Sequence, residues 1–373
     1  DDLGVRRVIN ASATLTRLGG SLMPPPVLAA MQEGASAFID LPELQQRIGE
    51  RIAELTHNDA CYISSGAAAG IAVAVSACLT GGDPAKVAAL PENPGDKNEV
   101  VVHRGQRNGY DHAARQTGAR MVEIGTKEGT QPEELEAAIG PHTACVLYFA
   151  GAHYARCAAP LPDVIRIAHA RGVPVLVDAA AQIPPVSNLW HFTRDLGADI
   201  AIFSGGKGLR GPQSSGLVLG RADIIAACRP NASPNHSLGR PMKVGKEEML
   251  GLLAAVEWSL GRDEATVLAD YEVTVQMWLA GLADIPGVRA ERGYPSEAGQ
   301  PHSRAIIHIG PPCPLTRDDV VAALWAQDPR IAVASVGDDA IALNPQTLEP
   351  GEAEQVLTAL RQVLMRQPSP LAR

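Results

Sequence analysis

The chain has 373 residues, which is enough for one large domain and a smaller one, because domains mostly run to about 100–200 residues. Hydrophobic residues make up 46% of the chain and charged residues 20%, the balance of an ordinary globular protein. The formal net charge of −9 argues against sequence-independent nucleic-acid binding, which needs a face rich in lysine and arginine. A local basic pocket for a small anionic substrate remains compatible with that charge.

Six cysteines are scattered along the chain, without a Cys-x-x-Cys pair or a histidine spacing suited to zinc. We expect them to be buried, reduced thiols, and we expect no metal site. The first ten residues, DDLGVRRVIN, are too polar for a secretory signal, and the longest apolar run, residues 67–79, is too short to cross a bilayer. The sequence therefore predicts a cytoplasmic protein without a membrane partner.

Short β-branched runs alternate with alanine-rich helical stretches in the first two thirds of the chain. Continuous apolar strands separated by helices are typical of a mainly parallel sheet that is covered on both faces. The strands predicted here are residues 60–63, 99–103, 144–150, 173–178, 199–204 and 216–219, and the helices are 111–117, 131–139 and 161–171.

The last third of the chain follows a loop rich in proline, glycine, serine and asparagine at residues 231–244. Two helices are predicted after the loop, and then a smaller unit with two or three strands and a closing helix. We expect an N-terminal arm at residues 1–20 that contributes to the active site, a large domain at 21–244, and a linking helix with a small α+β domain at 245–373. The elements predicted in this part are helices 245–261, 266–282 and 351–365 and strands 305–309, 331–335 and 340–343.

A lysine in a glycine-rich turn, Ser204-Gly205-Gly206-Lys207-Gly208, directly follows a predicted strand. Glycines allow the backbone to approach a ligand closely. A lysine that is removed from water and lies near other cations loses its proton more readily, and it then reacts with an aldehyde to form an imine. Taken alone, the same lysine could be a solvated surface charge.

Asp178 ends a predicted buried strand and is followed by three alanines and Gln182. A carboxylate at the carboxyl end of a parallel sheet lies where α/β folds bind ligands. Such an acid can keep the ring nitrogen of pyridoxal 5′-phosphate (PLP) protonated, and the small Ala180 leaves room for the ring. The alternative is an N-cap for the following segment.

The segment Ser64-Ser65-Gly66-Ala67-Ala68 follows a short predicted strand and opens a helix. The backbone N–H groups and the dipole at such a helix start favour an anion such as a phosphate. An ordinary serine N-cap would explain the same residues. This helix start, then Asp178, then Lys207 follow one another in the order typical of fold-type I PLP enzymes.

Longer motifs resemble the SelA-like branch of the fold-type I PLP enzymes, which includes selenocysteine synthases and D-glucosaminate-6-phosphate ammonia-lyases. The resemblance covers about residues 5 to 260, and the small domain is less distinctive. The matching motifs are residues 8–20, 64–67, 103–106, 110–112, 178–182, 204–208, 211–213 and 239–246.

The resemblance implies an α/β fold of the aspartate aminotransferase-like class, with PLP held as an imine on Lys207 and Asp178 as the partner of the ring nitrogen. Aromatic stacking on the ring is usual in this fold type, and His103, Gln106 and His112 are the candidates for that place. The cofactor contacts that the resemblance implies are Ser64, Ser65, Gly66, Ala67, Gln106, Asp178, Ala180, Gln182, Ser204 and Lys207.

Four basic residues stand where the family places basic groups around the substrate or phosphate: Arg104, Arg240, Lys243 and Lys246. A carboxylate or a sugar phosphate would suit them. Surface charge around a subunit interface is the alternative. The family also implies a homo-oligomer built from dimers, with each active site completed by a neighbouring subunit.

The reaction that the resemblance favours is α,β-elimination, in which Lys207 removes the α-proton and the product hydrolyses to a 2-keto acid and ammonia. A small amino acid or amino-sugar acid is the expected substrate, for two reasons. The chain is acidic, and motif 8–20 begins almost at the first residue of this sequence, whereas in selenocysteine synthases a tRNA-gripping extension precedes that motif. Racemisation and β-replacement with the same cofactor stay open. The presence of Lys207 and Asp178 argues against a non-catalytic scaffold. A nicotinamide-dependent enzyme is disfavoured because no G-x-G-x-x-G run follows the first predicted strand.

Overall fold

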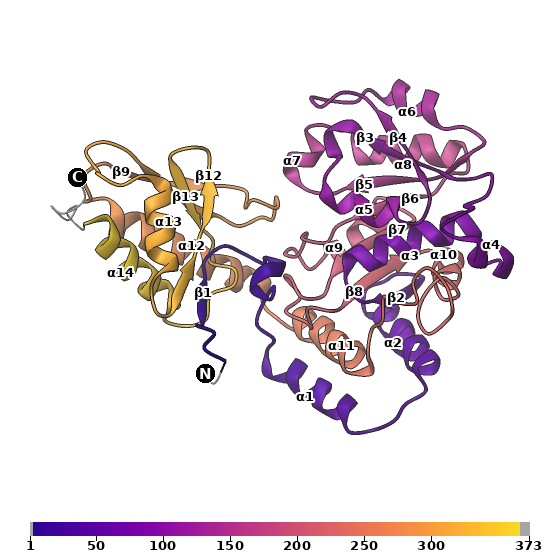
Figure 1. Cartoon of the computed structure of the whole chain (residues 1–373), viewed down its shortest axis with the longest axis horizontal. Coiled ribbons are helices and arrows are strands. Elements are labelled where there is room, and N and C mark those ends of the chain that lie inside the picture. The colour runs from indigo at the N-terminus through magenta and orange to yellow at the C-terminus, as the bar shows by residue number, and fades with distance from the viewer. Residues whose placement is uncertain (1–2, 366–373) are drawn as a thin grey trace. The chain divides into compact units, whose positions relative to one another are not determined.

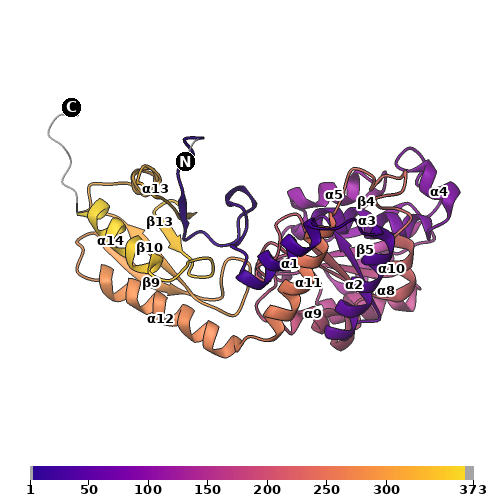
Figure 2. The ribbon, with the colours of Figure 1, turned by 90° about the horizontal axis from the view of Figure 1, so that it is seen from below.

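The computed structural model describes residues 3–365, which divide into two compact units (Figure 1, Figure 2). The larger unit comprises residues 22–262, and the smaller one joins the residues up to 21 with those from 263 onward. Two details differ from the division expected from the sequence. The helix at 245–261 belongs to the larger unit, and the N-terminal arm pairs with the smaller one.

A seven-stranded sheet, in the order β2-β8-β7-β6-β5-β3-β4, forms the centre of the larger unit (Figure 1). Within this sheet β8 alone runs against its neighbours, and every other pairing is parallel, so the expected mainly parallel sheet is confirmed. The strands are β2 (Ala60–Ser64), β3 (Glu99–His103), β4 (Arg120–Ile124), β5 (Thr143–Phe149), β6 (Val175–Asp178), β7 (Ile200–Ser204) and β8 (Gly216–Gly220).

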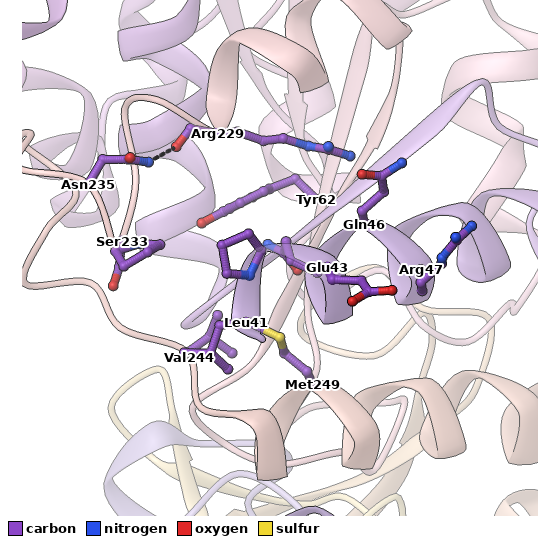
Figure 3. Close-up of a pocket in the computed structure, with 13 residues that line it drawn as sticks. Leu41, Glu43, Gln46, Arg47, Tyr62, Arg229, Ser233, Asn235, Val244 and Met249 are labelled. Atoms are coloured by element: carbon purple, nitrogen blue, oxygen red, sulfur yellow. Dashed lines mark hydrogen bonds between the residues drawn. The ribbon is translucent and has the colours of Figure 1, made fainter. Parts of the chain in front are cut away.

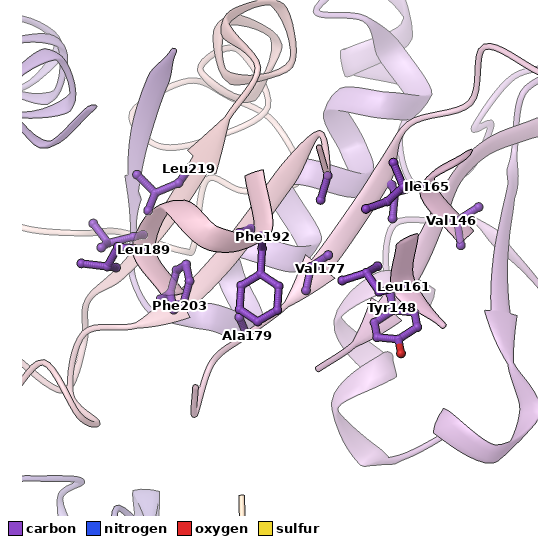
Figure 4. Close-up of a cluster of buried hydrophobic side chains, with 14 of the residues drawn as sticks. Val146, Tyr148, Leu161, Ile165, Val177, Ala179, Leu189, Phe192, Phe203 and Leu219 are labelled. Atoms are coloured by element: carbon purple, nitrogen blue, oxygen red, sulfur yellow. The ribbon is translucent and has the colours of Figure 1, made fainter. Parts of the chain in front are cut away.

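Helices cover both faces of this sheet, and each face has its own buried cluster. The side covered by α3, α5 and α10 is called the α3 face below, and the side covered by α2, α8 and α11 is called the α8 face; Figure 4 shows part of the cluster on the α8 face. The helices of the larger unit are α1 (Pro25–Ala35), α2 (Leu41–Leu55), α3 (Ala67–Thr80), α4 (Pro84–Ala89), α5 (His112–Arg115), α6 (Pro132–Ala138), α7 (Ala152–Ala155), α8 (Leu161–Ala170), α9 (Asn188–Trp190), α10 (Ala222–Cys228) and α11 (Lys246–Leu260).

Strand alternation decides which side chains reach which face, because successive residues of a strand point to opposite sides. In β6, Val175 and Val177 belong to the cluster on the α8 face, whereas Leu176 belongs to the α3 face. Asp178 therefore points to the α3 face. By the same count Ser204, two residues after Ile202 in β7, also points there.

The smaller unit contains a four-stranded antiparallel sheet in the order β12-β13-β10-β9 and a parallel pair of β1 with β11. Its core surrounds Trp278, which is fully buried and whose indole N–H donates to the carbonyl of Ala353 at 3.0 Å. The elements are β1 (Val8–Asn10), β9 (Val288–Gly293), β10 (Arg304–Ile309), β11 (Arg330–Ala332), β12 (Ala334–Val336), β13 (Ala340–Leu343), α12 (Glu264–Leu282), α13 (Arg317–Trp325) and α14 (Glu352–Leu364).

Two sequence expectations fail in detail. The single strand expected at 331–335 is two strands, because β11 pairs with the N-terminal arm while β12 pairs with β13. The helix expected at 111–117 is reduced to α5, preceded by a 3-10 turn at Gly109–Asp111. Among the described residues, no helix has both the length and the apolar character that a membrane-spanning segment needs.

His103, at the end of β3, is buried on the α8 face with its ring edge-on to the ring of Tyr148, the two centroids lying 5.6 Å apart. Neither ring nitrogen has a hydrogen-bond partner among the described residues. Burial without a partner disfavours the protonated imidazole. The pKa of His103 is accordingly lowered by burial to about 4.

This histidine should make the folded state sensitive to acid. As pH falls from 6.5 towards 4, the unfolded chain binds a proton at His103 before the folded chain does, so stability is lost across that window. We expect wild type to lose roughly 2–3 kcal/mol more between pH 7 and pH 4 than His103→Phe, which keeps the edge contact. Urea unfolding at a series of pH values measures the difference, and parallel curves for the two proteins would contradict it.

Candidate active site

Asp178 and Lys207 meet at the carboxyl ends of the adjacent strands β6 and β7. Asp178 is buried, and its Oδ1 accepts a hydrogen bond from the N–H of Ala180 at 3.0 Å. Burial raises the pKa of Asp178, while the Ala180 N–H and the Lys207 ammonium act in the opposite direction. Burial lowers the pKa of Lys207, and the Asp178 carboxylate only partly offsets this. An amine with a lowered pKa is suited to imine formation, because the neutral form is the nucleophile.

The turn that carries Lys207 is fixed by its own backbone. The N–H of Gly205 donates to the carbonyl of Ser215 at 2.8 Å. A Cβ at Gly208 would lie 2.0 Å from the carbonyl oxygen of Ile183, so no larger residue fits there without moving the chain. The glycine-rich composition seen in the sequence therefore reflects close backbone approach.

The start of α3 provides the expected anion site. Helix α3 begins after Gly66, which has no side chain to cap the helix, so within the described part of the chain its first backbone N–H groups receive no bond from the N-cap residue. Gly66 has φ 125° and ψ 165°, a conformation that only glycine adopts readily. The hydroxyl of Ser64 donates to the Gly66 carbonyl at 2.9 Å and so closes the turn, which leaves Ser65, Gly66 and Ala67 at the open end.

Gln106 and Gln182 both hold the segment that follows β5. The Gln106 carboxamide accepts from the N–H of Phe149 at 3.0 Å and donates to its carbonyl at 3.1 Å. Gln182 donates to the carbonyl of Ala150 at 3.4 Å. These bonds give both side chains a positioning role at the carboxyl end of β5, and their direct contact with the cofactor stays a prediction.

The structure places the three ring-stacking candidates in different surroundings, and which of them covers the ring stays a prediction. His103 directly follows Val102, whose side chain lies on the α3 face. Because successive strand residues alternate, His103 lies on the α8 face, opposite Asp178. His112 is exposed at the start of α5, and the Gln106 amide is bonded to the backbone of β5.

The aromatic residue that sequence reasoning missed is Tyr154, in α7. Its ring packs against Phe149, with centroids 5.9 Å apart, and against His153, with centroids 3.9 Å apart. Tyr154 lies close enough to Asp178 for that carboxylate to contribute to raising its pKa. Its position, shortly after the end of a strand that neighbours β6, is the signal that could have found it.

The four predicted substrate-binding residues fall into two places. Arg104 follows β3 and pairs with Glu123 of the edge strand β4, Nε to carboxylate, at 3.1 Å. Lys246 donates to the carbonyl of Gly34 in α1 at 2.7 Å. Arg240 and Lys243 precede Lys246 in the loop that leads to α11, so these three follow one another along the chain. A substrate role for the four residues stays a prediction.

A pocket of about 550 Å³ lies in the larger unit beside β2, the other edge of the sheet (Figure 3). Neither Lys207 nor Asp178 lines it, so it is a separate feature. Its lining residues are Leu41, Pro42, Glu43, Gln45, Gln46, Arg47, Tyr62, Arg229, Ser233, Pro234, Asn235, Val244 and Met249.

Known proteins share this architecture along the whole chain. Residues 87–238 match the aminotransferase class-V family model. The D-glucosaminate-6-phosphate ammonia lyase of Salmonella typhimurium is 34% identical over 369 residues, covering 97% of this chain and 96% of that one. The 5′-C-glycyluridine monooxygenase-decarboxylase of a Streptomyces species is 34% identical over 381 residues, covering 97% and 91%. A solved structure of D-glucosaminate-6-phosphate ammonia-lyase matches with a TM-score of 0.84 and 33% identity over 97% of both chains.

The sheet order, the strand-end carboxylate and lysine, and the open helix start thus belong to a fold-type I PLP-dependent enzyme. Within that class, the chain belongs to the family of D-glucosaminate-6-phosphate ammonia-lyase and the SelA-like selenium transferases, as its motifs indicated. The cofactor of this family is PLP. The residues present fit it, since a buried carboxylate, an amine of lowered pKa and an uncapped helix start are the groups that its ring nitrogen, aldehyde and phosphate require.

Lys207 should be the residue that PLP labels. We expect wild type with added PLP to show an imine absorbance band near the visible edge, and Lys207→Ala to lack it. The lowered pKa of Lys207 means that imine formation should reach its plateau below the ordinary lysine pKa of 10.5. Borohydride reduction and tryptic mapping locate the label, with Lys86→Ala as a surface control. A label on the peptide of Lys243 or Lys246 would overturn the assignment.

Proposed function

We propose that the protein is a PLP-dependent ammonia-lyase, which eliminates a β-substituent from a small amino acid or amino-sugar acid to give a 2-keto acid and ammonia. The observation that carries the proposal is the full-length likeness to D-glucosaminate-6-phosphate ammonia-lyase in both sequence and structure. The Asp178–Lys207 pair supports it with the groups that such a reaction needs.

Three groups of the larger unit would hold the cofactor. Asp178 would bind its ring nitrogen, the first turn of α3 at Ser65 and Gly66 its phosphate, and Lys207 its aldehyde carbon. PLP, when bound, withdraws electrons from the α-carbon of an amino acid and so makes loss of the α-proton feasible. The buried carboxylate, the uncapped helix and the amine of lowered pKa support these roles.

Lys207 would then act as the base. Because its pKa is lowered, a larger share of its amine is neutral at a given pH, and the neutral amine can accept the α-proton of the substrate. Loss of the substituent from the β-carbon follows, and hydrolysis releases ammonia.

Oxidative decarboxylation is a second candidate, because the Streptomyces monooxygenase-decarboxylase is as similar to this chain as the Salmonella lyase is. The two reactions differ in what they consume and release. Elimination needs no oxidant and keeps the carboxylate, whereas an oxygenase-decarboxylase takes up O₂ and releases CO₂. Racemisation and β-replacement also stay open from the sequence, but no structural observation favours them.

A product assay separates these reactions. The holoenzyme is incubated with D-glucosaminate-6-phosphate and with both enantiomers of serine and threonine, while keto acid, ammonia and dissolved O₂ are followed. We expect equal amounts of keto acid and ammonia without O₂ uptake, and no product with Lys207→Ala. O₂ uptake with CO₂ release would support the second candidate, and an inverted enantiomer without keto acid would show a racemase.

We infer further that the protein works in the cytoplasm as a homo-oligomer built from dimers. Its six cysteines are free thiols. On the larger unit, the side chain of Phe38 is completely exposed in the single chain, and Leu22 and Leu28 are largely exposed. Leu41, which comes shortly after Phe38 in the chain, lines the pocket beside β2 together with Met249 and others (Figure 3). An exposed aromatic side chain on a segment that also exposes leucines suits a two-fold interface, where one patch meets its own copy.

Removal of the exposed aromatic should weaken this assembly. We expect wild type to elute as a dimer or a multiple of it, and Phe38→Ser to shift towards the monomer at micromolar concentration, because a buried phenylalanine contributes about 2–3 kcal/mol per copy. Size-exclusion chromatography with light scattering measures the mass. Val273→Ser, at an exposed position of the smaller unit, serves as the control. A monomeric wild type would contradict the inference.

A further inference from the structure

The segment that follows β5 brings Tyr154 to the end of the sheet where Asp178 lies. Phe149, the last residue of β5, is in register with Asp178 of β6, and the N–H of Ala150 donates to the Asp178 carbonyl at 2.9 Å. The Tyr154 ring packs on Phe149 within the cluster of the α3 face. Asp178 points to that same face, so the phenol and the carboxylate share one side of the sheet.

The loop after β3 holds Tyr154 in place. Nε2 of Gln106 lies 3.5 Å from the Tyr154 carbonyl oxygen and 3.1 Å from that of Phe149. A Cβ at Gly105 would lie 2.2 Å from Cβ of Cys157, which shows how closely the two loops approach. The loops after β3 and β5 are therefore packed closely against each other on either side of these contacts.

The Asn108 side chain lies near enough to the Tyr154 phenol to act on its pKa, which it lowers. Asn108 is itself fixed, because its Nδ2 donates to the Gln106 carbonyl at 2.9 Å and its Oδ1 accepts from the N–H of Tyr110 at 2.8 Å. The Asn108 amide is thus held in place beside the phenol by the backbone of its own loop.

The surroundings keep the phenol protonated. Burial raises the pKa of Tyr154, the Asp178 carboxylate and the Tyr110 phenol raise it further, and Asn108 alone acts in the opposite direction. The stacked His153 adds no cation at neutral pH, since burial lowers its pKa. A group in this state can donate a proton and cannot accept one through its oxygen as a base.

We propose that Tyr154 is the general acid of this active site and gives its phenolic proton to the oxygen that leaves the β-carbon of the substrate. The role rests on the proposed elimination. In that step the Lys207 amine takes the α-proton and the β-carbon–oxygen bond breaks. The electron pair of that bond takes the Tyr154 proton, so that water leaves, and the phenolate regains a proton from solvent. Hydroxide leaves poorly, and a positioned donor accelerates such a step by about 10²–10⁴-fold.

The test compares two leaving groups in Tyr154→Phe, which keeps the ring and its contacts and removes only the hydroxyl. A β-hydroxy amino acid that wild type accepts needs the donor, whereas β-chloroalanine of the same configuration loses chloride without a proton. We expect kcat for the hydroxy substrate to fall by about 10²–10⁴-fold, and that for β-chloroalanine to stay within about threefold.

Two further measurements show that the site is otherwise intact. The absorbance titration of Tyr154→Phe with PLP should match that of wild type, and exchange of the substrate α-hydrogen with D₂O should persist, because Lys207 is unchanged. The basic limb of the wild-type pH profile for the hydroxy substrate, which reports loss of the phenolic proton, should disappear. Tyr294→Phe, an exposed tyrosine of the smaller unit, is the matched control and should leave both rates unchanged.

Other outcomes overturn the proposal. Equal losses on both substrates would make Tyr154 a positioning residue, and unchanged rates on both would mean that another group donates the proton. If wild type releases keto acid from β-chloroalanine but from no hydroxy substrate, elimination stands and the acid role fails. If it releases keto acid from neither, the proposed elimination itself fails.

Discussion

Two ionisable groups, Asp178 and Lys207, are withdrawn from water close to each other. The architecture of the larger unit depends on holding this pair together at the end of the sheet. Burying either group alone would be costly and would drive it to its neutral form. Their opposite charges partly offset that cost, as the opposing effects on the two pKa values show. Adjacent parallel strands accomplish the pairing, because β6 and β7 end at the same edge of the sheet. The pKa of Lys207 stays lowered, so the amine loses its proton more readily, and the pKa of Asp178 stays raised, so the acid keeps its proton more readily. These two shifts prepare the pair for a cofactor that reacts with amines.

Strand alternation then determines what else can take part. It directs Asp178 and Ser204 to the side where α3 begins, so that a carboxylate, a lysine turn and an anion site converge on one face. The same alternation turns His103 to the opposite face, where it packs on Tyr148 and becomes an acid-sensitive part of the core. A histidine at the end of a strand is thus directed to the face opposite Asp178.

The loops complete the site by close backbone approach. Gly208 has no space for a Cβ beneath the Lys207 turn, and Gly105 has none where the loops after β3 and β5 meet. Gln106 acts within this packing, since its amide bonds hold the end of β5 and the Tyr154 segment. Arg210, at φ 56°, is strained by about 1 kcal/mol, but its Nε donates to the Leu22 carbonyl at 2.7 Å. The turn that carries Lys207 is accordingly fixed at both its ends.

The sequence by itself determined the class of fold, the family and the cofactor, because these depend on local signals: apolar strand runs, glycine turns and the order of the motifs around Ser65, Asp178 and Lys207. It also located the buried strands to within one or two residues, since continuous β-branched runs leave little choice of period. Strands β4 and β9 escaped it because Glu123 and the charged residues of Val288–Gly293 interrupt the apolar pattern at exposed sheet edges. Only the tertiary structure decided that Arg104 pairs with Glu123 of β4 and that Tyr154 lies on the same face of the sheet as Asp178. These placements follow from strand order and from the pairing of loops distant in the chain, and residue spacing along a sequence does not by itself fix either of them.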